Sequence, residues 1–155
     1  MSILLLLLFD HRFSDFWNRC RYLLDMAYYH VQMMMYRPFI HYICTKVPHG
    51  NNATMAARNC IRVAIRIVNL ADTMRERGIL NGAYWFTMYT TFFATISLLF
   101  LVVEKPEGNY TCWKAANTGR AALDCLKQRS HAADKCSVAL KVCSEVLFSF
   151  CMCLT

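Results

Sequence analysis

Hydrophobic residues recur at every third or fourth position along most of the chain, which is the spacing of α-helices with one buried face. The first such segment runs from Ser14, a candidate N-cap, to Tyr36, and Pro38 marks a break after it. The side chains expected to face inward are Phe16, Trp17, Cys20, Leu23, Leu24, Ala27, Tyr28, Val31, Met34 and Met35. The apolar run from Ser2 to Phe9 indicates a further buried helical segment, with a cleaved secretion signal as the alternative.

A second helix is predicted over residues 54 to 77. Its stop is Gly78, because glycine accepts the left-handed conformation that follows a last helical turn. The outer side carries Arg58, Arg62 and Arg66, which we interpret as a solvated helix face. The inner side is expected to hold Cys60, Ile61, Ala64, Ile65, Ile67, Val68, Ala71 and Met74.

Two more helices are predicted over residues 113 to 128 and 130 to 152, the last with Ser130 as its cap. The expected inward stripe of the last helix consists of Ala133, Cys136, Ala139, Leu140, Cys143, Val146, Leu147 and Phe150. No segment alternates in the manner of a strand. The pattern therefore predicts an all-α fold, an irregular multi-helix domain without a fixed repeat.

The segment from Ile79 to Val103 contains 25 residues and no charge, which is long enough to cross a bilayer. Tyr84 and Trp85 lie near one end, where interfacial aromatic anchors would stand. A helix buried on all sides within a helical protein has the same hydropathy. The periodicity alone leaves both a membrane span and a core helix open.

The composition of the chain limits the kinds of functional site that it could form. The chain has 155 residues, a formal net charge of +7 and nine cysteines, but its basic residues are scattered rather than clustered. The cysteines show no Cys-x-x-Cys spacing and lie mostly among aliphatic residues, so we expect them to be free and buried. No phosphate loop, nucleophile elbow or metal-binding helix motif occurs, which argues against an enzyme. The five histidines lie far apart and are expected to be structural.

Several short motifs resemble the regulatory domain of fungal zinc-cluster transcription factors, also called their middle homology region. The similar residues are Arg37, Pro38 and Phe39, then Cys60 and Gly78, then Gly82, Ala83, Tyr84, Trp85, Phe86, Phe92 and Phe93, and finally Pro106. The Gly-Ala-Tyr-Trp-Phe-Thr run is the most specific part, and the resemblance covers roughly residues 14 to 150. None of these motifs is catalytic.

The resemblance implies an all-helical regulatory segment in a nuclear protein, with residues 1 to 155 as one part of a larger helical domain. The family binds DNA through an N-terminal six-cysteine zinc cluster, and none of the cysteines here matches that cluster. We therefore expect no cofactor in this chain, with zinc and DNA contacts belonging to a part not represented in it. A homodimer or a partner from the transcription machinery is expected, and an integral membrane protein with a span at 79 to 103 stays the alternative.

Overall fold

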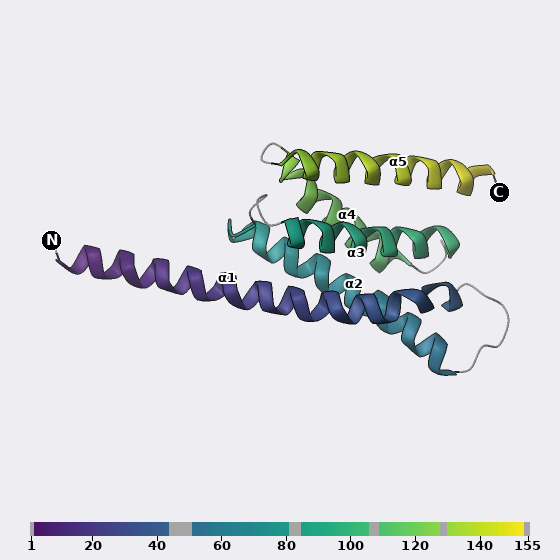
Figure 1. Ribbon diagram of the computed structural model, residues 1–155. Helices are drawn as coiled ribbons and strands as arrows, with labels where there is room; N and C mark the ends of the chain where they lie inside the picture. The colour runs from purple at the N-terminus through teal and green to yellow at the C-terminus, as the bar shows by residue number, and fades with distance from the viewer. Residues whose placement is uncertain (1, 44–50, 81–84, 106–108, 128–129, 154–155) are drawn as a thin grey trace.

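The computed structural model describes residues 2–43, 51–80, 85–105, 109–127 and 130–153, with side-chain surroundings given for 16–43, 52–80, 85–105, 109–127 and 130–146. These residues form five α-helices and one 3-10 helix, without a strand among them (Figure 1). The all-α prediction is confirmed. The elements are α1 (Ser2–Tyr36), η1 (Arg37–Ile43), α2 (Asn51–Glu76), α3 (Trp85–Glu104), α4 (Tyr110–Asp124) and α5 (His131–Cys153).

The apolar helix α3 lies at the centre of the described fold. It packs against α1, α2, α4 and α5, and half of its 20 residues are buried. By length and composition it could cross a membrane, yet 56% of its most apolar window lies inside the protein. The buried hydroxyls of Thr91 and Thr95 donate to the carbonyl oxygens one turn earlier, at 2.8 Å each, so they need no outside partner. The structure therefore favours a core helix over a membrane span.

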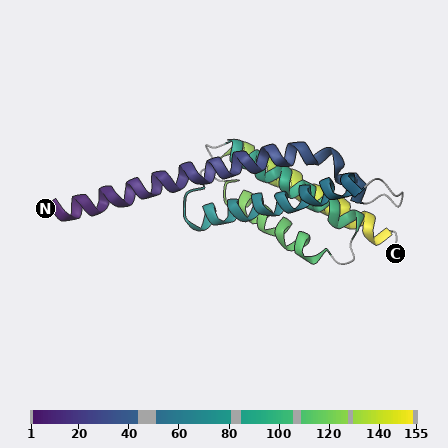
Figure 2. The same cartoon turned by 90° about the horizontal axis from the view of Figure 1, so that it is seen from below.

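Helix α1 is one continuous helix, which corrects the prediction of an N-cap at Ser14. Neither proline nor glycine lies between Ser2 and Tyr36, so nothing in the backbone interrupts it. Figures 1 and 2 both show its first part extending past the other helices. The predicted burial of the side chains of residues 2–9 lies outside the described surroundings. Pro38 ends the helix as expected, and the chain continues as the 3-10 turns of η1.

The buried face of α1 is not the one that the sequence pattern predicted. Met26 and Met33 are fully buried against α2 and α3, while most of the expected inward residues are exposed. The exposed members are Phe16, Trp17, Cys20, Leu24, Tyr28, Val31, Met34 and Met35. The helix is apolar on both sides, and packing against α2 selects the side with Met26. Arg66 of α2 and Arg77, which directly follows α2, reinforce this contact by covering aromatic rings of α1.

Helix α2 begins three residues earlier than predicted and ends as expected. Gly78 has a φ of +66°, and its N–H donates to the carbonyl of Arg75 at 3.0 Å. The N–H of Ile79 donates to Met74 at 2.9 Å, which completes a Schellman motif. The predicted inner residues are buried, apart from the half-buried Ile65, and the arginine stripe is exposed.

Helices α3 and α4 approach closely at Gly119. A Cβ atom on this glycine would stand 2.2 Å from the Thr95 hydroxyl oxygen and 3.2 Å from Val68 Cγ2. Only a residue without a side chain fits between these helices. This contact fixes α4 against the centre of the fold.

Helix α5 begins with the predicted cap. The Ser130 hydroxyl accepts from the N–H of Ala133 at 3.4 Å, and its carbonyl accepts from Asp134 at 3.1 Å. The inward stripe is correct through Leu140, but Cys143 is exposed, as is Val146. The buried positions of these turns are Ser137 and Ser144 instead. Leu147 and Phe150 lie outside the described side chains.

Candidate functional site

The structure brings three of the family-like residues together. The Arg37 guanidinium lies 4.9 Å from the centre of the Phe93 ring, so the start of η1 is held to α3. Cys60 of α2 is fully buried, and desolvation raises the pKa of its thiol to about 11, while the nearby Arg37 charge acts in the opposite direction. Pro38 and Phe39 are exposed beside them. This cluster joins η1, α2 and α3, and its geometry is that of a structural junction rather than a reactive centre.

A second group of the family-like residues lies at the start of α3. Trp85 is exposed, and the half-buried Phe86 packs edge-on against it and against His30 of α1, at centroid separations of 6.1 and 5.2 Å. His30 Nδ1 lies 3.2 Å from the Thr90 hydroxyl, which gives this histidine the structural role expected for it. Phe92 and Phe93 are half-buried neighbours. Gly82, Ala83, Tyr84 and Pro106 lie outside the described residues.

The cysteines divide into two groups. Cys60, Cys112 and Cys136 are buried, as predicted, and burial raises the pKa of each thiol. The prediction of burial is wrong for Cys20 and Cys125, which are exposed, as it is for Cys143 on α5. All six are free thiols, and the part of the chain that the structure describes contains no group of three metal-ligating side chains. The buried thiols behave as small hydrophobic side chains.

The exposed side of α1 carries the most conspicuous surface of the described fold. Trp17, Leu24, Tyr28, Val31 and Met35, which we call the outer face of α1, are between 58% and 71% exposed. Their steps of seven, four, three and four residues align them along one side of the helix. Such spacing is the seam that a second helix fills in helix–helix packing. The sequence predicted an apolar stripe here, but assigned it to the core.

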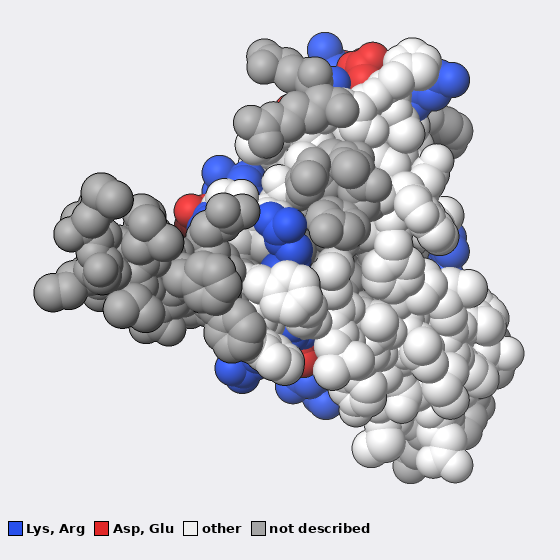
Figure 3. Space-filling model, turned by 60° about the vertical axis from the view of Figure 1, so that its left-hand side comes forward, with Lys and Arg blue, Asp and Glu red and all other residues white. Residues whose placement is uncertain are grey.

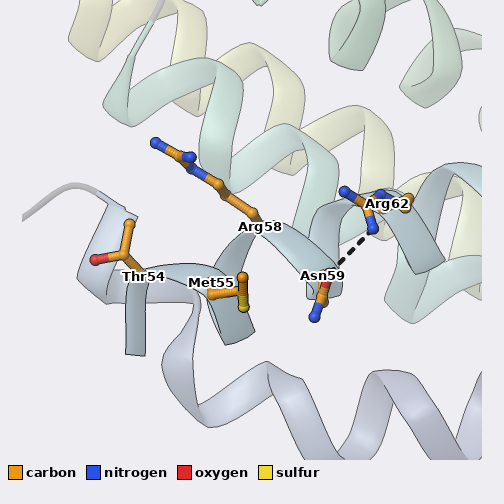
Figure 4. Close-up of a pocket in the computed structure, with 5 residues that line it drawn as sticks. All are labelled: Thr54, Met55, Arg58, Asn59 and Arg62. Carbon is orange, nitrogen blue, oxygen red and sulfur yellow. Dashed lines mark hydrogen bonds between the residues drawn. The ribbon is translucent and has the colours of Figure 1, made fainter. Parts of the chain in front are cut away.

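A cavity of about 680 Å³ lies along the first half of α2, and we call it the α2 cavity. Five residues of the described chain line it, namely Thr54, Met55, Arg58, Asn59 and Arg62 (Figure 4). Arg62 Nη1 donates to Asn59 Oδ1 at 3.3 Å, whereas the Arg58 side chain extends away from the helix without a partner among the described residues. No carboxylate is among these lining residues. The sequence predicted a solvated face for these arginines, and they are exposed, but it offered no sign of the cavity beside them.

Charged residues are distributed in small separate groups on the face that Figure 3 displays, and a broad area of this face carries none. Arg66, the third member of the stripe, lies 5.8 Å above the Tyr29 ring. The exposed stripe of Arg58, Arg62 and Arg66 on α2 is short, whereas a protein that follows a nucleic acid backbone makes about 6 to 10 phosphate contacts.

Comparison with known proteins shows that the chain is similar to fungal proteins that are named as transcription regulators. It is 36% identical to Activator of stress genes 1 of Saccharomyces cerevisiae over 129 residues, which cover 77% of this chain and 13% of that protein. It is 39% identical over 82 residues to Activator of stress genes protein 1 of Candida albicans, covering 51% and 8% of the two chains. An uncharacterized transcriptional regulatory protein of Schizosaccharomyces pombe is 32% identical over 102 residues, covering 59% and 12%. No protein-family model and no solved structure matches the chain.

The relatives are all named as activators or transcriptional regulators, and none as an enzyme. The chain is therefore similar to a part of fungal transcription regulators, in agreement with the resemblance of its sequence motifs. The chain spans between 8% and 13% of the length of these relatives.

Proposed function

We propose that this chain is a regulatory and interaction segment of a nuclear transcription regulator, and that it works by packing its helices against a partner. The expected occupant of the outer face of α1 is an amphipathic α-helix, contributed by another part of the regulator, by a second copy or by a partner protein. DNA binding in such a regulator would belong to a zinc cluster outside these residues, so this segment would couple a partner or effector to that function.

The observation that carries the proposal is the outer face itself. Five large apolar side chains stand exposed in one row, and their exposure costs free energy until they are covered. Their helical spacing suits a helix better than a small ligand, because successive side chains can enter the gaps between those of a facing helix. The similarity to transcription regulators also supports a partner at the outer face of α1, since regulators work through contacts with other protein segments.

The exposed cysteines offer a direct test in the full-length regulator. Cys20 lies on the same side of α1, between Trp17 and Leu24, whereas Cys125 follows the end of α4. We expect maleimide to label Cys125 at the rate of a free thiol and Cys20 at least ten times more slowly, because a docked helix covers it. Urea at a concentration that unfolds the protein should equalise the two rates. Equal rates in the native protein would refute the proposal.

Charge substitutions extend the test to function. Leu24→Lys introduces a charge into the middle of the outer face, and Asn69→Lys introduces the same charge at an exposed position of α2. In a reporter assay with the full-length regulator, Leu24→Lys should lose most of the regulated transcription, while Asn69→Lys keeps it. Both should remain nuclear and bind DNA in vitro as the unaltered regulator does. If Leu24→Lys regulates normally, the outer face has no role in regulation.

A further inference from the structure

We propose that the α2 cavity is a binding site for a phosphate monoester dianion, held between Arg58 and Arg62. The site is separate from the outer face of α1 and does not rest on the function proposed for it. Its ligand class follows from the charges and hydrogen-bond donors of the five lining residues.

The two arginines carry positive charges that nothing in the described chain neutralises. Arg58 has no partner there, and the neutral Asn59 side chain is the one hydrogen-bond partner given for Arg62. They stand four residues apart on one face of α2, where like charges repel each other and weaken the helix. An anion with two charges removes this repulsion.

The remaining donors favour a phosphate group over a carboxylate. Asn59 Oδ1 accepts from Arg62, which leaves the Asn59 amide N–H groups without a partner among the described residues. The Thr54 hydroxyl lines the same cavity one turn before Arg58. Two guanidinium forks, an amide and a hydroxyl can together satisfy three phosphate oxygens, whereas a carboxylate has two oxygens and one charge.

The surroundings argue against a nucleic acid as the source of the phosphate. Arg66 continues the stripe but covers the Tyr29 ring, so the accessible guanidinium pair ends at Arg62. Nucleic acid binding generally uses a longer series of phosphate contacts. A single pair of exposed guanidinium groups fits one terminal phosphate, whether on a small phosphorylated molecule or on a phosphorylated side chain.

The test measures binding of inorganic phosphate to the 155-residue chain by titration at constant ionic strength. We expect a dissociation constant in the millimolar range, with about tenfold weaker binding in Arg58→Ala and in Arg62→Ala, since each removes one charge-assisted contact. Arg66→Ala is the matched control, one turn further along the same face, and should bind within twofold of the unaltered chain. Circular dichroism verifies that each variant keeps its helices.

Two further measurements separate the ligand classes. Phosphate binding should strengthen between pH 5.5 and 7.5, as the second proton leaves with a pKa of about 6 to 7, whereas sulfate binding should not change. A phosphoserine peptide that binds more tightly than glycerol phosphate would identify a phosphorylated protein segment as the source, and equal binding would identify the phosphate group as sufficient. The proposal is overturned if phosphate does not bind at 50 mM, if Arg66→Ala weakens binding as much as Arg58→Ala, or if duplex DNA binds tighter in an Arg66-dependent manner.

Discussion

The close contact of α3 and α4 at Gly119 gives the sharpest prediction about stability. Replacing a helical glycine by alanine ordinarily stabilises a helix by about 1 kcal/mol. At Gly119 the new methyl carbon would stand 2.2 Å from the Thr95 hydroxyl oxygen, far inside van der Waals contact. Thr95 is fully buried and bonded to the Thr91 carbonyl, so it cannot move aside cheaply. Overpacking of this kind costs about 1 to 3 kcal/mol, and the severe overlap places it at the upper end.

We therefore expect Gly119→Ala to lower the free energy of unfolding by about 2 kcal/mol, the upper overpacking cost less the propensity gain. With a urea dependence of about 2 kcal/mol per molar, the midpoint should fall by about 1 M. Urea titration followed by circular dichroism measures the shift. Thr118→Ala, one residue away on the outer side of α4, is the control and should change stability by less than about 0.5 kcal/mol.

A double-mutant cycle locates the cause. Thr95→Ala removes the hydroxyl that the new methyl group would meet, although Val68 Cγ2 still lies at 3.2 Å. The double variant should therefore be more stable than the sum of the two single effects by at least about 1 kcal/mol. If Gly119→Ala is as stable as the unaltered chain, or if the two effects simply add, the close approach of α3 and α4 is not as described.

Substitutions at four other positions follow from features described above. Gly78→Ala should cost about 1 to 2 kcal/mol in urea unfolding, because an alanine would have to adopt a φ of +66°; Ser130→Ala should cost about 1 kcal/mol through loss of the α5 cap. Arg37→Ala should cost about 1 kcal/mol by removing the contact with the Phe93 ring, and Arg37→Lys should restore part of it. The pKa of the Cys60 thiol is raised to about 11 in the fold, so as the pH passes about 9 this thiol ionises first in the unfolded chain. The free energy of unfolding therefore falls above that pH. Cys60→Ala should show a shallower fall between pH 8 and 10. An equally steep fall in Cys60→Ala would contradict this assignment.

The sequence predicted the helices well and their packing less well. Helix ends at Gly78 and Ser130 were predictable because the backbone conformation and the cap are local properties of these residues. The buried face of α1 was not, because Leu24 and Met26 belong to apolar stripes on opposite sides and only α2 decides between them. In such a helix, the spacing of hydrophobic residues identifies the apolar stripes but does not tell which of them is buried.

The candidate sites show the same division. The motifs containing Arg37 and Phe93 were visible in the sequence, but their contact across 56 residues depends on how η1 meets α3. The sequence indicated the arginines of the α2 cavity but not the cavity itself, since a hollow depends on how the folded chain is arranged in space. The residue types thus indicated which interactions are possible, and the tertiary structure determined which residues lie together.

The two apolar sides of α1 also matter during synthesis. This helix precedes α2 in the chain, and the end of α2 follows the end of α1 by 40 residues. At about 5 to 20 residues per second, translation therefore leaves the α1 segment without its α2 partner for about 2 to 8 s. Ribosome-bound chains in which α1 has left the exit tunnel and α2 has not should consequently cross-link to chaperones more strongly than chains in which both helices have emerged. Completion of α2 shelters the side with Met26, whereas the opposite side stays exposed in the described fold. If the proposed partner helix covers that side, the supply of the partner would set how much of the protein survives quality control.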